Sequence, residues 1–199
     1  MSTQISIYYS IGVLLILSTM FSIFSKYTEN IYPFHDNYRC GESHELCPTN
    51  RILWVRFLHY MTTFYFVLYY FIFDKKYDFY YIVLYLGLVL HWLITDECLL
   101  SKWEMSYYKE KDVGSLHYQS QSPSTLLHPH VRVFVGSYTD YIILFQGLCM
   151  SLILFMVILR YAENYPKYSK YTFIFGWFSI IIMQTYLMLK DRMNLFNFF

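Results

Sequence analysis

The sequence predicts an all-α fold, an integral membrane helical bundle with about five transmembrane helices. Of the 199 residues, 56% are hydrophobic and 15% are charged, which leaves too few polar side chains to cover a soluble globule of this size. The apolar residues come in blocks that are long enough to cross ~30 Å of hydrocarbon as helices. These blocks do not alternate apolar and polar residues, so they favour helices over a β-barrel. We therefore expect one transmembrane domain over residues 1–199.

Five blocks meet this requirement, with uncharged cores of 17 to 21 residues. The predicted spans are 5–25, 53–73, 79–99, 141–159 and 171–189. The second and third have the shortest cores, so flanking residues such as Trp54, Arg56 and Trp92 are needed to complete the crossing. With five spans, the loops 26–51 and 101–140 lie on one side of the membrane. The distribution of Lys and Arg leaves the orientation open.

The loop 26–51 contains two of the four cysteines, Cys40 and Cys47. The six residues between them allow a local disulfide. An oxidising compartment favours that disulfide, and a reducing one favours free thiols. With His35 and His44 the pair offers a third possibility, a zinc site, although the spacing matches no compact zinc pattern. All three alternatives remain open.

Polar side chains of several spans are expected at one depth, roughly 7 to 11 Å below the surface that carries the long loops. The candidates for this polar layer are Arg56, His59, His91, Thr95, Gln146 and Gln184. Ionisable groups inside a membrane usually face the interior of the bundle. They either lock the helices by hydrogen bonds or line a cavity for an ion, proton or polar ligand, with His59 and His91 as titrating groups. We expect Asp96 or Glu97 to meet Arg56 at the rim.

The most specific local string runs from His91 to Glu104, at the end of the third span. Its polar pattern is His91-Trp92 followed by Glu97-Cys98-x-Leu100-Ser101-x-x-Glu104. This pattern resembles a short signature of uncharacterised multi-span membrane proteins of large double-stranded DNA viruses. The resemblance implies a host or viral membrane as the location, and it implies no chemistry.

Other patterns narrow the function. A net charge of +1 without a basic run excludes a nucleic-acid partner. Hydrolase, metalloprotease, phosphate-loop and channel-filter signatures are missing, which argues against an enzyme and leaves any cofactor unknown. No metal ligands are assigned, since His128-Pro129-His130 alone is a weak signal.

The leading expectation is a structural or accessory membrane component that acts through contacts with the bilayer, with partner membrane proteins or with a second copy of itself. One alternative is a small transporter, channel or proton-handling subunit that uses the polar layer. Another is a membrane redox or His-dependent enzyme.

Overall fold

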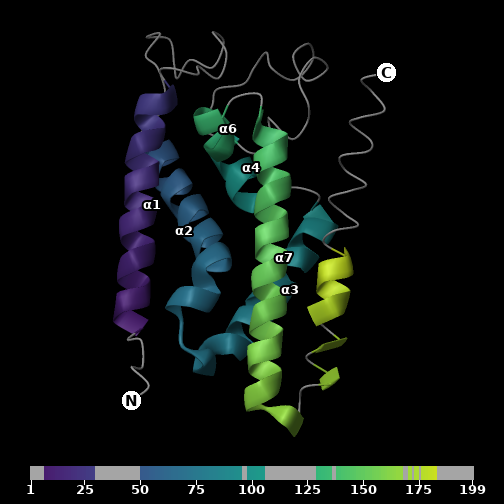
Figure 1. The fold of residues 1–199 in the computed structure, drawn as a ribbon. Helices are drawn as coiled ribbons and strands as arrows, with labels where there is room; N and C mark the ends of the chain where they lie inside the picture. The colour runs from purple at the N-terminus through teal and green to yellow at the C-terminus, as the bar shows by residue number, and fades with distance from the viewer. Residues whose placement is uncertain are drawn as a thin grey trace, which may run out of the picture. The chain divides into compact units, whose positions relative to one another are not determined.

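Helices are the only regular secondary structure in the part of the chain that the structure describes (Figure 1). A computed structural model describes residues 7–29, 50–95, 98–105, 129–135, 138–167, 170–171, 173–174 and 176–182. Its elements are α1 (Ile7–Glu29), α2 (Asn50–Ile72), the short 3-10 helix η1 (Lys75–Tyr77), α3 (Asp78–Thr95), α4 (Leu99–Met105), α6 (Pro129–Val135) and α7 (Thr139–Asn164). The predicted all-α class is confirmed for these residues.

Two of these helices are long and apolar enough to cross a membrane, namely Ile7–Thr28 within α1 and Tyr141–Asn164 within α7. The described residues thus supply two such helices and not the five predicted. Helix α2 has 23 residues, but it is rich in Tyr and carries Arg56 and His59, which make it less apolar. Helix α3 ends at Thr95, short of the predicted boundary at residue 99.

The predicted span 171–189 is described only at a few positions up to residue 182. The loops 26–51 and 101–140 also lie largely outside the described residues. Five spans and the placement of both loops on one side therefore stay predictions.

The chain divides into two compact units. The first consists of Met1–Leu14, Thr63–Asp96 and Leu144–Phe199, and the second of Leu15–Thr62 and Glu97–Ile143. Helices α1, α2 and α7 each contribute to both units. Helix α3 belongs to the first unit, while α4 and α6 belong to the second.

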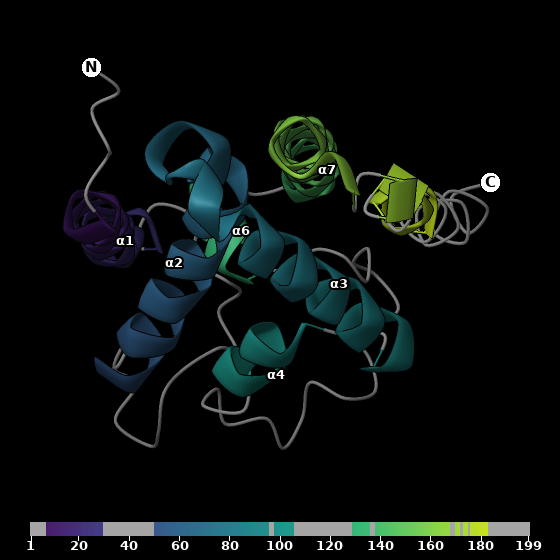
Figure 2. The same cartoon turned by 90° about the horizontal axis from the view of Figure 1, so that it is seen from below.

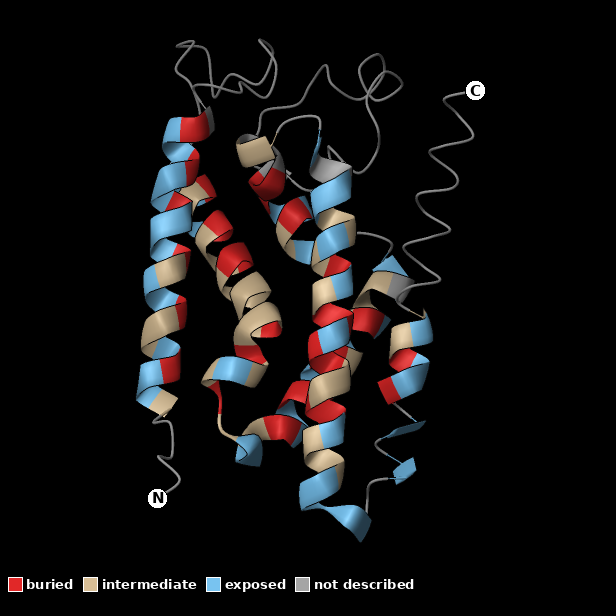
Figure 3. Cartoon of the chain, in the orientation of Figure 1, coloured by how far each residue is buried: buried red, intermediate tan, exposed pale blue. Residues whose placement is uncertain are grey.

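Helix α1 buries a stripe made mostly of small polar residues and exposes many of its large apolar ones (Figure 3). The buried stripe, at a spacing of three or four residues, is Ser10, Leu14, Ser18, Ser22, Ser25 and Thr28. The exposed face includes Tyr8, Ile11, Ile16, Met20, Ile23, Phe24 and Tyr27. A surface helix of a soluble protein has the opposite arrangement, with its apolar stripe towards the core.

The stripe of small residues on α1 packs against α2, and the two helices lie side by side in both views (Figure 1 and Figure 2). In the second unit, the Ser22 hydroxyl donates to the Leu53 carbonyl over 2.7 Å. In the first unit, the Ser10 hydroxyl donates to the Ile72 carbonyl. Small side chains at a helix interface let the backbones approach closely, as in membrane helix pairs.

The interior of the first unit is aromatic. Tyr69, Tyr81 and Tyr85 are fully buried, and the rings of Tyr69 and Tyr81 stack with centroids 4.2 Å apart. The Tyr81 hydroxyl donates to the Phe66 carbonyl over 2.9 Å, so its polar atom is satisfied inside the unit.

Candidate functional site

Three elements of the second unit bring together two histidines and a glutamate. His59 comes from α2, Glu104 from α4 and His130 from α6, and all three side chains are buried. One potential ligand atom of each lies within 4.8 Å of the others. We call these three residues the His59 cluster.

Local sequence explains how each element presents its residue. On α2, His59 follows Arg56 by three residues, so both lie on one face of the helix. On α4, Ser101 and Glu104 are likewise three residues apart, and α4 buries both. Helix α6 begins at Pro129, a residue that suits the first turn of a helix because its missing N–H would have no partner there.

The carboxylate of Glu104 is held by a buried ion pair. Arg56 Nε donates to Glu104 Oε1 over 2.7 Å, and neither side chain is exposed to solvent. The same guanidinium donates from Nη1 to the Ser25 hydroxyl over 3.3 Å, which joins α1 to the network. Charge-assisted bonds of this length fix the orientation of the carboxylate.

The two imidazole rings of the cluster stack, with centroids 3.4 Å apart and planes inclined by 28°. His59 Nε2 lies 3.4 Å from the Cys98 sulfur, and His59 Nδ1 is buried without a hydrogen-bond partner among the described residues. The backbone carbonyl of His130 accepts from the Tyr60 hydroxyl over 2.7 Å. The arrangement therefore offers two nitrogen donors, one carboxylate and a nearby thiol, a set that can hold a metal ion or move a proton.

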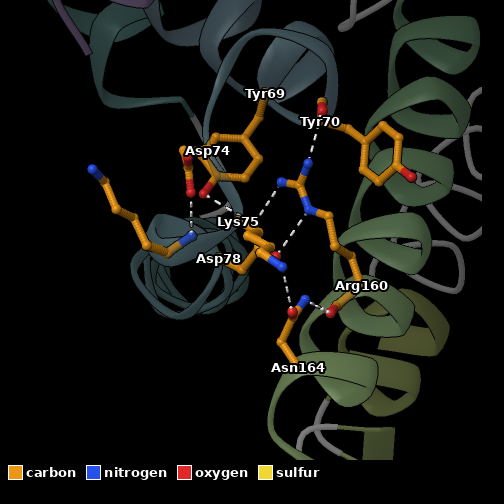
Figure 4. Close-up of polar contacts among 8 residues, drawn as sticks. Tyr69, Tyr70, Asp74, Lys75, Asp78, Arg160 and Asn164 are labelled. Atoms are coloured by element: carbon orange, nitrogen blue, oxygen red, sulfur yellow. Dashed lines mark hydrogen bonds and ion pairs between the residues drawn. The ribbon is translucent and has the colours of Figure 1, made fainter. Parts of the chain in front are cut away.

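A second polar network lies in the first unit and is built around Arg160 of α7 (Figure 4). Its guanidinium donates to both carboxylate oxygens of Asp78, over 2.9 Å from Nε and 2.6 Å from Nη2. Nη1 donates to the Tyr70 carbonyl over 2.9 Å, near the end of α2. The Tyr69 hydroxyl donates to Asp78 over 3.2 Å.

This second network is a closed one in which donors and acceptors meet. Asp78 precedes the third predicted span and is fully buried. Burial raises the pKa of Asp78, and the hydrogen bonds and charge of Arg160 oppose that shift. Nearby, Lys75 donates to the Asn164 side chain over 2.8 Å (Figure 4). The network ties the start of α3 to α7 and has the features of a structural clamp.

Of the predicted polar layer, Arg56 and His59 lie together in the second unit. Arg56 pairs with Glu104, whereas Asp96 and Glu97, its expected partners, lie outside the described residues.

The other candidates of the layer have different positions. His91 is half-buried and Thr95 exposed, with the Thr95 hydroxyl 3.4 Å from His91 Nε2 in the first unit. Gln146 donates to the Thr63 hydroxyl over 3.4 Å in the same unit. Gln184 lies outside the described residues, as do Cys40 and Cys47 with their three alternatives. The layer as a whole stays a prediction.

Sequence reasoning missed Glu104, His130 and Cys98 as members of a site. A signal for two of them was present, because the string ending at Glu104 places Cys98, Ser101 and Glu104 three residues apart. His130 had only the weak signal of its neighbours His128 and Pro129. Nothing in the sequence indicated that this segment meets α2.

No family model, no curated protein and no solved structure matches this chain. The resemblance of the His91–Glu104 string to viral membrane proteins therefore stays a prediction.

Proposed function

We propose that this chain is an integral membrane protein that serves its membrane as a structural or accessory component, through contacts with lipid and with partner helices. The inverted polarity of α1 carries this proposal, because buried serines and an outer face of large apolar side chains suit hydrocarbon and not water. Helix α7 also exposes large apolar side chains, namely Tyr141, Phe145, Leu148 and Leu152. Soluble monomers rarely expose apolar patches beyond a few hundred Å².

Alkaline extraction tests membrane integration. The full chain, expressed with a small tag in cells, is expected to stay in the membrane pellet at high pH and to dissolve only in detergent. Recovery of the folded chain in the aqueous supernatant would contradict the proposal.

The five-span topology is part of the proposal and has its own test. Glycosylation acceptor sites are inserted one at a time into loops 26–51 and 101–140 and into the connection 160–170. Five spans predict that the two long loops give the same result and that the third insertion gives the opposite one. Modification of only one long loop would exclude this topology.

A second candidate function, a His-dependent centre inside the bundle, is favoured by His59. Its Nδ1 atom is buried without a hydrogen-bond partner among the described residues, a costly arrangement that helix locking does not require. Complementation in cells that lack the native chain separates the candidates. If the role is purely structural, the His59→Gln variant should stay in the membrane and keep its function. If an internal centre is required, the variant should stay in the membrane but lose its function.

A further inference from the structure

We propose that His59, Glu104 and His130 form a binding site for a divalent transition metal of the zinc class. The proposal goes beyond the role in the membrane, and it rests on the convergence of three ligand residues from three separate helices. Their potential ligand atoms lie within 4.8 Å of one another, and all three side chains are buried. Two imidazoles and one carboxylate make a donor set that binds Zn²⁺, Co²⁺ or Fe²⁺ in proteins.

His59 has the arrangement of a metal-binding imidazole. Such a ring uses one nitrogen for the metal, while the other nitrogen contacts a second group that fixes the tautomer and the ring orientation. His59 Nε2 contacts the Cys98 sulfur at 3.4 Å, and the opposite nitrogen, Nδ1, is buried without a hydrogen-bond partner among the described residues. A metal ion would satisfy the lone pair of Nδ1.

Glu104 is oriented in the same way. Arg56 holds Oε1 at 2.7 Å, and we assign Oε2 as the oxygen that would bind a metal. Metal-bound carboxylates are commonly held by such an outer hydrogen bond. The Tyr60 hydroxyl, 2.7 Å from the His130 carbonyl, fixes the backbone that carries the third ligand.

The donor atoms decide the class of metal. The pair of Arg56 and Glu104 is neutral, so a divalent ion would bring its full charge into a buried site. Nitrogen ligands from His59 and His130 stabilise borderline ions such as Zn²⁺, whereas Mg²⁺ and Ca²⁺ require a shell of oxygen atoms that the cluster does not supply.

Metal content of the full chain purified in detergent is the test. The protein is stripped with a chelator, incubated with Zn²⁺ or Co²⁺, and freed of loose metal by gel filtration. We expect about one bound ion per chain, a visible cobalt spectrum, and a loss of both in His59→Gln and His130→Gln. The matched control His91→Gln removes a histidine of α3 and should bind as the native chain does.

Native protein that retains no more metal than a buffer blank, or histidine variants of the cluster that retain as much as His91→Gln, would overturn the proposal. Circular dichroism and elution volume establish that each variant folds. Should both histidine variants fail to fold, Glu104→Asp keeps the charge, and the cobalt spectrum of the native chain still decides. Alkaline extraction is scored separately, so failure of the metal site and failure of the membrane proposal are distinguishable.

Discussion

Replacing Arg56 by Met removes one half of a buried ion pair and leaves Glu104 as an uncompensated charge. Both side chains have no exposed surface, and Nε lies 2.7 Å from Oε1. At an effective dielectric constant of about 20, two unit charges at this distance attract by roughly 6 kcal/mol. Desolvation offsets part of this attraction, and breaking one side of such a pair costs about 3 to 5 kcal/mol. We expect a loss of that size in the free energy of unfolding.

A double-mutant cycle measures the coupling directly. Arg56→Met, Glu104→Gln and the double variant are unfolded in mixed micelles by a rising fraction of SDS, with a chelator present and tryptophan fluorescence as the signal. The double variant should cost no more than either single one, which corresponds to a coupling of at least about 3 kcal/mol. Arg51→Met, which removes an exposed arginine of the same helix, should change the stability by less than about 0.5 kcal/mol. Single variants that cost under about 1 kcal/mol, or that add independently, would refute the reasoning.

Three further perturbations follow from the contacts. Arg160→Met should cost about 3 kcal/mol at neutral pH. Because burial raises the pKa of Asp78, the deficit should shrink as the pH falls towards the ordinary Asp range near 4 and grow as it rises; a deficit that does not change with pH would contradict this. Ser22→Leu should lower stability by about 1 to 3 kcal/mol in SDS titration, because the larger side chain overpacks the interface between α1 and α2. Ser22→Ala should cost less than about 1 kcal/mol, and equal costs of the two variants would exclude close packing at this interface. Tyr60→Phe should lower the free energy of unfolding by about 1 kcal/mol and weaken Zn²⁺ binding roughly 10-fold or more. Competition with a chelating dye measures the affinity, and an unchanged affinity would show that Tyr60 does not support the metal site.

The helical class was predictable because long uncharged blocks in lipid or in a core have few other options. The position at which α3 ends was predicted less accurately. The predicted span continues to residue 99, but α3 ends at Thr95, directly before the charged residues Asp96 and Glu97 in the sequence, and Leu99 begins a separate helix. The length needed for a crossing therefore placed this boundary four residues too far along the chain.

The candidate site was predictable in part. His59 and Arg56 followed from the rule that ionisable groups in an apolar block face inward. Their partners Glu104 and His130 did not, because each lies on a helix of only seven residues with no long apolar pattern of its own. A short helix reports its local spacing, such as Ser101 and Glu104 on one face, but its tertiary partner depends on contacts far apart in the sequence.

The two polar networks differ in what they leave unsatisfied, and this difference yields the last prediction. Arg160 and Asp78 bond to each other and to groups of Tyr70 and Tyr69, so packing alone accounts for them. The buried Nδ1 of His59 has no hydrogen-bond partner among the described residues, so in metal-free protein it should cost stability.

His59→Leu removes that nitrogen at similar volume and should raise the free energy of unfolding by about 1 kcal/mol in the presence of a chelator. With Zn²⁺ at 100 times its dissociation constant, the native chain should gain about 2.7 kcal/mol and the variant nothing, so the order of stabilities reverses. SDS titration with and without Zn²⁺ measures both arms. The opposite result would be a His59→Leu variant that is less stable than the native chain in chelator, with Zn²⁺ stabilising neither protein. That result would show that the His59 cluster is a packing element, because only a ligand for the buried nitrogen makes a histidine favourable at this position.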